Sequence, residues 1–164
     1  MVADRGPAAA SGTDAGDAGS ARDAGSAQGA AGNVVFRRAV PVLRIFDVAK
    51  AHEFYVDYLG CTVDWEHRYE PGMPLYTQVS RGNLVLHLSE HHGDATPGST
   101  LHTELTGVRE LHAELAAKDY PYLRPGLEHD EIGTCLTLLD PFGNRLRFNE
   151  PGPGGDASSA RCDG

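Results

Sequence analysis

The side chains with the clearest chemical potential are His87, His102, Glu104 and Arg147, all in short runs typical of β-strands. His102 and Glu104 are two positions apart, so a strand places both on one face. With His87 they could form a metal site of two histidines and one carboxylate with open positions. Arg147 is expected on the same face, and a permanent cation opposes a bound divalent ion. These residues therefore favour a hydrogen-bonding pocket without metal, and the metal site remains the alternative.

Motifs for covalent catalysis or phosphate binding are absent from the sequence. No serine lies in a Gly-x-Ser-x-Gly turn, and no glycine-rich loop leads into a Lys-Ser or Lys-Thr pair. His102 and Glu104 would lie about 6.6 Å apart along their strand, too far for a direct acid–base pair. The sequence therefore assigns no catalytic residue and no cofactor.

Hydrophobic periodicity in residues 34–150 predicts one order of elements twice. The first half predicts a strand, a helix that begins after Asp47 and ends at Gly60, and three further strands, over 40–46, 47–59, 61–67, 75–80 and 83–90. The second half predicts the same series over 100–105, 108–118, 120–124, 134–139 and 144–150. We therefore expect an α+β fold of two tandem βαβββ modules, about 39–91 and 99–150, with curved sheets around a cleft and helices on the outer face.

Alternation within the first and last strand of each module predicts which face each side chain occupies. One parity is apolar and should face the helices: Leu43, Ile45, Leu84, Leu86, Leu88, Leu101, Leu105, Leu146 and Phe148. The opposite parity combines three valines with charged and polar residues: Val40, Val42, Arg44, Val85, His87, Ser89, Thr100, His102, Glu104, Arg145, Arg147 and Asn149. Because all four strands show this pattern, a polar-lined cavity explains it better than a solvent-wetted face.

The two ends of the chain are expected to be disordered tails. Residues 1–33 contain 11 Ala and 7 Gly with recurring Asp-Ala-Gly, and residues 151–164 are rich in Gly, Pro, Ser and Asp. Such segments bury too little apolar surface to offset the backbone entropy lost on ordering. Any function is therefore expected in residues 34–150.

Charge and composition exclude several classes of partner. The chain has net charge −9 with no basic stripe, which disfavours nucleic acid and anionic membranes. No run approaches a membrane-spanning length, and the N-terminus lacks the apolar core of a signal peptide. Cys61, Cys135 and Cys162 show no short pair spacing, so we expect neither a disulfide framework nor a zinc cluster, and a cytoplasmic protein. Cys61 and Cys135 are expected to be ordinary strand residues.

Several motifs resemble the bleomycin-resistance branch of the vicinal-oxygen-chelate (glyoxalase) superfamily. They are Ala39-Val40-Pro41-Val42-Leu43, Asp47-Val48-Ala49-Lys50-Ala51, Glu53-Phe54-Tyr55, Tyr58-Leu59-Gly60 and Asp140-Pro141-Phe142-Gly143-Asn144. The resemblance places the superfamily's metal-ligand positions at Val40, His87, Thr100 and Arg147. Of these only His87 could bind a metal, which favours the metal-free binding branch.

The same resemblance implies a homodimer that sequesters a cationic glycopeptide antibiotic without chemistry, in clefts at the subunit interface. Trp65, Tyr69 and Tyr76 could stack on the drug's flat rings, although a core role for Trp65 is equally compatible with the sequence. Pro41 lies where the branch has the hinge of an exchanged N-terminal strand, or it is simply an edge-strand proline. Rim carboxylates for a cation are expected at Asp64, Glu66, Glu70 and Glu90.

One departure from the branch weakens the drug-binding interpretation. His102 and Glu104 stand where a drug-binding relative has two tryptophans, which makes the expected cleft more polar. Two alternatives therefore remain open: a metal-free binder of another small metabolite, and a metal-dependent enzyme of the glyoxalase or dioxygenase type.

Overall fold

The computed structural model describes residues 34–129 and 133–153. The chain divides into two units, residues 1–37 and 38–164, and the helices and strands of the described residues lie in the second. The expected N-terminal tail, residues 1–33, and residues 154–164 of the expected C-terminal tail lie outside the described residues.

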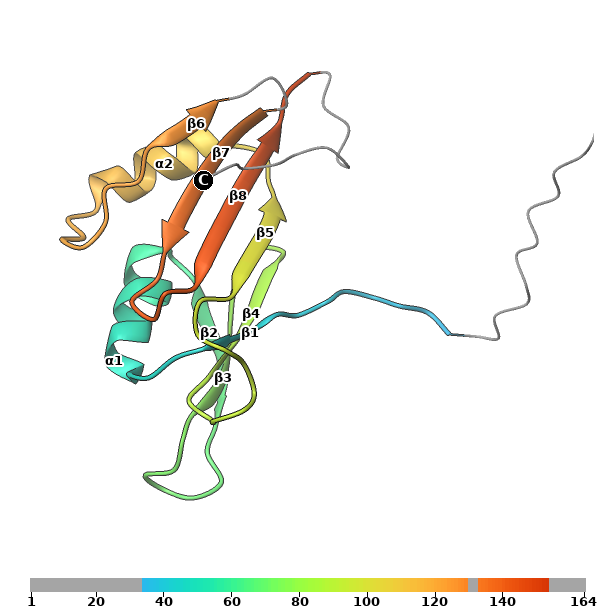
Figure 1. The fold of residues 1–164 in the computed structure, drawn as a ribbon, viewed down its shortest axis with the longest axis vertical. Coiled ribbons are helices and arrows are strands. Elements are labelled where there is room, and N and C mark those ends of the chain that lie inside the picture. The colour runs from blue at the N-terminus through green and yellow to red at the C-terminus, as the bar shows by residue number, and fades with distance from the viewer. Residues whose placement is uncertain (1–33, 130–132, 154–164) are drawn as a thin grey trace, which may run out of the picture. The chain divides into compact units, whose positions relative to one another are not determined.

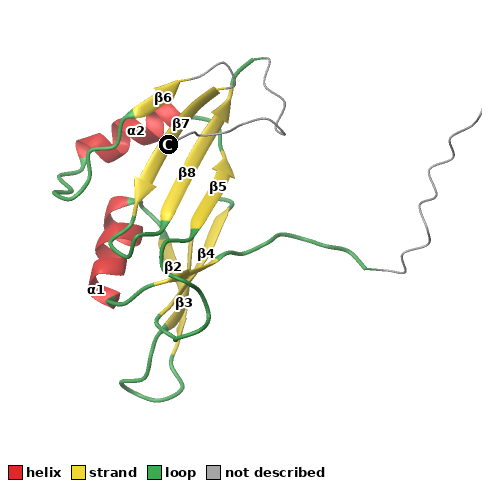
Figure 2. Cartoon of the chain, viewed as in Figure 1, coloured by secondary structure: helices red, strands yellow, loops and turns green. Residues whose placement is uncertain are grey.

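Two βαβββ modules follow one another, as predicted (Figure 1, Figure 2). The first contains β1 (Val42–Arg44), α1 (Val48–Ala51), the π-helical segment η1 (His52–Tyr58), β2 (Thr62–His67), β3 (Tyr76–Arg81) and β4 (Leu84–Ser89). The second contains β5 (Thr100–Glu104), α2 (Val108–Ala117), β6 (Leu127–His129), β7 (Gly133–Leu139) and β8 (Arg145–Pro151). The α+β fold class and the order of elements are therefore confirmed.

Each module forms one mixed four-stranded sheet with the same strand order. In the first module the order is β1-β4-β3-β2, and in the second it is β5-β8-β7-β6. The first strand of each module pairs in parallel with the last, while the remaining pairs are antiparallel. Within the described chain, β1 and β5 are each paired on one side only.

The predicted apolar parity forms the core. Leu43, Leu86, Leu88, Leu146 and Phe148 are buried in one cluster that draws on both modules. Helix α2 packs against β7 and β8 on this side of the second sheet. The opposite parity is thereby left on the other face of each sheet, where the candidate site residues lie.

The first helix begins as predicted and then changes its winding. Asp47 caps it by accepting a hydrogen bond from the Lys50 amide at 3.0 Å. From His52 it continues as the π-helical segment η1. At the end of this segment the Leu59 amide donates to the Phe54 carbonyl, five residues earlier, at 2.8 Å. This segment buries the adjacent Phe54 and Tyr55 completely.

The predicted strand over 120–124 is wrong. Tyr120 instead stacks on Tyr58 of η1, with ring centroids 4.4 Å apart, and the second strand of the module is the later β6. Pro121 and Pro125 cannot donate to a strand ladder, which disfavours pairing of this segment. The aromatic residue is therefore used for helix packing rather than for a sheet.

A buried hydrogen-bond cluster joins the two modules. Tyr55 Oη donates to Asp140 Oδ2 at 2.6 Å, and Asn144 Nδ2 donates to the Arg44 carbonyl at 2.9 Å. Asp140 also accepts from the amides of Phe142 and Asn144, at 2.9 and 2.6 Å, and from Asn144 Nδ2 at 2.8 Å. The turn before β8 therefore fixes the first module against the second.

Helix α2 is capped from a distance. Its N-cap residue is Gly107, which has no side chain to cap the helix with. Glu150 at the end of β8 accepts from the amides of Gly107 and Val108 at 2.7 and 3.2 Å. This carboxylate satisfies two of the unpaired helix amides and complements the helix dipole. No helix in the described part of the chain is long and apolar enough to cross a membrane.

Candidate binding site

The polar face of the first sheet holds a compact group of aromatic residues from three strands. In the strand register, Trp65 of β2 lies opposite Gln78 of β3, and Gln78 lies opposite His87 of β4. Trp65 stacks on Tyr76 with ring centroids 5.9 Å apart at 17°, and His87 meets the edges of both rings at 5.3 Å. Trp65 is 40% exposed, so it belongs to this face and not to the core. We call Trp65, Tyr76 and His87 the aromatic platform.

A chain of hydrogen bonds runs through the platform in one direction. Gln78 Nε2 donates to Asp64 Oδ2 at 2.7 Å, so the Gln78 carbonyl oxygen faces His87. His87 Nε2 donates to that oxygen at 3.1 Å, and His87 Nδ1 accepts from Tyr76 Oη at 2.9 Å. Ser80 Oγ donates to the second oxygen of Asp64 at 2.9 Å. The network thus assigns the proton of His87 to Nε2 and ends on a carboxylate.

The electrostatics of the platform agree with this arrangement. Partial burial, with a smaller contribution from nearby Arg38, holds the pKa of His87 below its usual 6.5. Hydrogen bonds from Gln78 and Ser80 lower the pKa of Asp64 below its usual 3.8. At neutral pH the platform therefore presents a neutral imidazole, and the ionised carboxylate of Asp64 lies at the end of its hydrogen-bond network.

Tyr69 lies beside the platform, in the loop between β2 and β3. Its ring meets the edges of His67 and His91, with centroids 5.2 and 5.8 Å away, and it is largely exposed. His67 lies opposite Tyr76 in the strand register. The three aromatic residues expected to contact ligand therefore belong to one continuous region of the first module.

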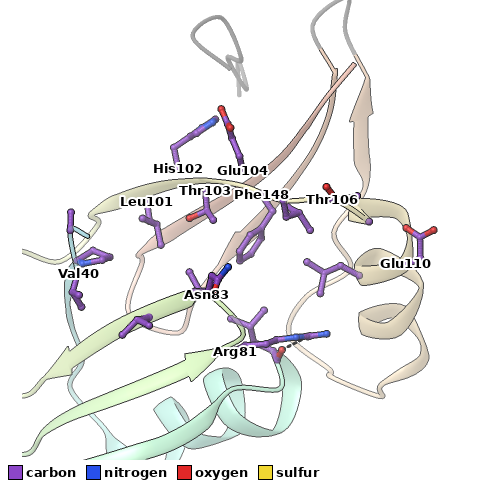
Figure 3. A pocket seen from close by; sticks show the side chains of 18 of the residues that line it. Val40, Arg81, Asn83, Leu101, His102, Thr103, Glu104, Thr106, Glu110 and Phe148 are labelled. Atoms are coloured by element: carbon purple, nitrogen blue, oxygen red, sulfur yellow. Dashed lines mark hydrogen bonds between the residues drawn. The ribbon is translucent and has the colours of Figure 1, made fainter. Parts of the chain in front are cut away.

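The polar residues expected from the second module lie on β5 and β8. His102 pairs with Arg147 and Glu104 with Asn149, so all four share one face of the second sheet. His102 and Glu104 are exposed, while Arg147 is half-buried. In Figure 3 the side chains of His102 and Glu104 project from β5 on the side opposite to Leu101 and Thr103. This face is distinct from the aromatic platform.

The alternative metal set of His87, His102 and Glu104 is not assembled. Both ring nitrogens of His87 are already hydrogen-bonded to Tyr76 and Gln78. Within residues 34–129 and 133–153, no group of three His, Cys, Asp or Glu side chains is arranged to hold a metal ion. The residues therefore do not fit a metal centre of the expected composition.

A groove of about 1060 Å³ lies between the modules, on the inner side of β5. Leu84, Leu101, Leu111 and Phe148 give it apolar walls, and Glu110 and Glu114 lie at its border with Arg81. Figure 3 shows Phe148 pointing into its centre. His102 and Glu104 contribute to its edge, but no residue of the aromatic platform does. Pro41 also lines it, and the Pro41 carbonyl accepts from the His87 amide at 3.0 Å.

The four expected rim carboxylates have different surroundings. Asp64 belongs to the platform network. Glu90 is bound to the Leu75 amide at 2.7 Å and to Arg68 at 3.2 Å, so its charge is already compensated. Glu66 lies 3.4 Å from His52, and Glu70 is exposed in the β2–β3 loop. Asp64 is thus the carboxylate that the structure brings to the aromatic rings.

Two features of the site region had no counterpart in the sequence predictions. The first is Gln78, which connects His87 to Asp64. It could have been found only by pairing the two neighbouring strands, which places Gln78 opposite His87. Cys135 was expected to be an ordinary strand residue; it lies in β7, but it takes part in a disulfide. Cys61 is a free, buried thiol just before β2, and burial raises its pKa to about 11.

Tandem βαβββ modules, each with its first strand parallel to its last, define a protein of the vicinal-oxygen-chelate fold. The chain belongs to the glyoxalase superfamily, because residues 24–155 match the family described as glyoxalase superfamily protein. Among solved structures it is similar to a bleomycin-binding protein from bleomycin-producing Streptomyces verticillus, complexed with copper(II)-bleomycin. The two are 30% identical over 73% of this chain and 99% of the other, with a TM-score of 0.55, which places the chain in the bleomycin-resistance branch.

Two further structures share the fold. TnmS3, an antibiotic-binding protein from Streptomyces sp. CB03234, is 20% identical over 73% of this chain and 99% of its own, with a TM-score of 0.58. A bleomycin resistance determinant encoded on transposon Tn5 is 22% identical over 71% of this chain and 98% of its own, with a TM-score of 0.52. Among curated proteins no match is found.

Proposed function

We propose that this protein binds a bleomycin-type cationic glycopeptide antibiotic without chemical conversion and protects by sequestration. The observation that carries the proposal is the aromatic platform on an open sheet face, where stacked rings lie beside the ionised carboxylate of Asp64. The similarity to the Streptomyces verticillus protein, described with copper(II)-bleomycin, supports the same class of ligand.

The platform suits a flat, positively charged heteroaromatic group. Stacking on Trp65 and Tyr76 supplies apolar contact, and the ring faces attract a cation. The Tyr76 hydroxyl proton is committed to His87, so its oxygen is left to accept hydrogen bonds from ligand N–H groups. Asp64 adds a negative charge at the end of the same network. Each part of the platform therefore favours a donor-rich cation.

We further propose a cytoplasmic, metal-independent homodimer with an exchanged N-terminal strand hinged at Pro41. Unpaired sides of β1 and β5 support this, since an exposed strand edge is ready to accept another strand. Val34, Val35 and Phe36 are exposed apolar residues ahead of the hinge, suitable for covering in a partner. In such a dimer the polar faces of two subunits could form the two walls of one cleft.

The second candidate function is binding of a different small polar metabolite. It is favoured by His102 and Glu104 on the second sheet, because these residues offer hydrogen bonds and not stacking. Such a ligand would depend on these two residues more than on the aromatic platform.

Metal-free bleomycin, titrated into the protein with calorimetry and fluorescence, tests the proposal. Trp65 is the only tryptophan of the chain, so its emission reports on the platform directly. We expect about one drug per subunit, a change in Trp65 emission, weaker binding at high salt and unchanged drug by mass spectrometry. Tyr76→Ala should weaken binding roughly tenfold or more.

Tyr122→Ala is the matched control, because Tyr122 is an exposed tyrosine in a loop of the second module. It should leave the affinity unchanged. Absence of heat and of any Trp65 response at micromolar drug would refute the proposal. Binding that is lost with His102→Ala but unaffected by Tyr76→Ala would favour the second candidate.

A further inference from the structure

A second cavity, of about 330 Å³, lies between the end of β1 and the loop that joins β2 to β3. Its lining includes two arginines, one glutamate and two exposed apolar side chains: Arg44, Arg68, Glu90, Phe46 and Met73. No residue of the aromatic platform lines it, so it is a separate cavity. We propose that this cavity binds a small aromatic carboxylate, with the carboxylate on Arg44 and the ring against Phe46 and Met73.

The charges that line the cavity leave one arginine uncompensated. Glu90 accepts from Arg68 at 3.2 Å and from the Leu75 amide at 2.7 Å, so Glu90 and Arg68 balance each other. Arg44 forms no ion pair among the residues that the structure describes. Two arginines against one glutamate give the lining one net positive charge, which favours an anionic ligand.

Arg44 is held in place while most of its donors stay available. Its guanidinium carbon lies 4.8 Å from the centroid of the Phe46 ring, and Nη1 donates to the Ser89 carbonyl at 3.1 Å. Within the described residues this is the one hydrogen bond of its side chain, and the other N–H groups are left for a carboxylate. Stacking on Phe46 fixes the guanidinium plane, so little side-chain freedom is lost when a planar anion binds.

Phe46 and Met73 supply the apolar contact for a ring. They are 55% and 47% exposed, although both are large apolar side chains. Phe46 is held by an edge contact with Phe142, whose ring centroid lies 6.0 Å away. Methionine sulfur interacts favourably with aromatic rings, and a ligand ring between these two side chains would remove both from water. An aromatic carboxylate therefore suits the cavity better than an inorganic anion.

The loop side of the cavity is formed before any ligand binds. The Met73 amide donates to the Glu70 carbonyl at 3.0 Å, and Arg68 Nη1 donates to the Met73 carbonyl. Arg68 is itself anchored on Glu90, next to the Leu75 amide. These bonds fix the position of Met73 opposite Arg44, as expected of a small-molecule site that is largely preformed.

Methyl NMR of the full chain with phenylacetate as the probe tests the proposal. The chain has two methionines, Met1 and Met73, so ¹³C-methyl labelling of methionine gives a direct reporter that Met73→Leu assigns. We expect a saturable ring-current shift of the Met73 signal, with a Kd of about 1 mM or lower. Arg44→Gln should raise this Kd roughly tenfold or more, because the carboxylate loses its charged partner. The matched control is Arg109→Gln, an exposed arginine of α2, which should leave the Kd unchanged.

Phenylacetamide carries the same ring without the charge and needs no variant, so the test remains decisive if Arg44→Gln does not fold. It should bind the wild type at least tenfold more weakly than phenylacetate. Equal affinity for the two compounds would overturn the role of Arg44, and acetate binding as tightly as phenylacetate would overturn the ring contact. An unchanged Met73 signal at 10 mM phenylacetate would overturn the whole proposal. Bleomycin is not used in this experiment, so the outcome does not depend on the proposed function.

Discussion

The hydrogen bond between Tyr55 and Asp140 offers a direct measure of how the two modules are held together. Tyr55 Oη donates to Asp140 Oδ2 at 2.6 Å, and both residues are buried. Tyr55→Phe removes the donor and leaves the ring, so the packing of η1 is preserved. Asp140 then keeps the three donors that Phe142 and Asn144 provide.

The loss in free energy of unfolding expected for Tyr55→Phe follows from these contacts. A hydrogen bond to a charged acceptor contributes about 1.5–3 kcal/mol, and the larger values apply when the acceptor is left without a partner. Asp140 Oδ2 still accepts from Asn144 Nδ2, so we expect the free energy of unfolding to fall by about 1.5–2 kcal/mol. For a domain of this size that corresponds to roughly 5–10 °C in the unfolding midpoint. Urea unfolding followed by circular dichroism measures the change.

Tyr58→Phe is the matched control, three residues further along the same segment. Tyr58 Oη is buried and has no hydrogen-bond partner among the described residues. Removing it should therefore leave stability unchanged or raise it slightly, because an unsatisfied buried hydroxyl is lost. Equal destabilisation by both substitutions would refute the reasoning, since it would assign the effect to ring packing and not to the bond with Asp140.

Three further predictions concern His87, Glu150 and Cys61. The pKa of His87 is lowered in the folded state, so its contribution to stability is complete above about pH 6.5 and is lost as the pH falls below that value. Between pH 7.5 and 5.5 the free energy of unfolding, measured with urea, should therefore fall more for the wild type than for His87→Gln. Glu150→Ala should reduce the free energy of unfolding by about 1–2 kcal/mol, because two amides at the start of α2 lose their acceptor; Glu128→Ala, in exposed β6, should not. Cys61, with a pKa of about 11, should react with iodoacetamide at pH 8 only as fast as the domain opens.

The fold could be predicted because both modules repeat strong local signals. Alternation placed Leu86 and Leu88 in the core and His87 on the opposite face, and the structure agrees. Asp47 and Gly60 bounded the first helix as their chemistry requires. The wrong prediction depends on a distant partner: local periodicity predicts a strand at Tyr120, because its stacking partner, Tyr58, lies far back in the chain.

The position of Trp65 in the aromatic platform also could not be predicted from local sequence. Val63 and Trp65 are two positions apart, so plain alternation places both on the core side. A register shift between them moves Trp65 opposite Gln78, onto the polar face, while Val63 stays opposite Val79. Nothing local marks this bulge, which is why the sequence left Trp65 undecided between core and ligand. The bulge also brings Asp64 within reach of Gln78 and Ser80.

The net charge of the chain does not indicate where a cation would bind. The chain carries −9, but some of its carboxylates are matched locally, as Glu90 is by Arg68 and Glu114 by Arg81. Hydrogen bonds from two neutral side chains, Gln78 and Ser80, keep Asp64 ionised without cancelling its charge. A neutral network thus preserves a negative charge beside the aromatic rings, whereas a salt bridge at the same place would remove it. The attraction for a cation therefore depends on which partners a carboxylate has, and not on how many carboxylates the chain contains.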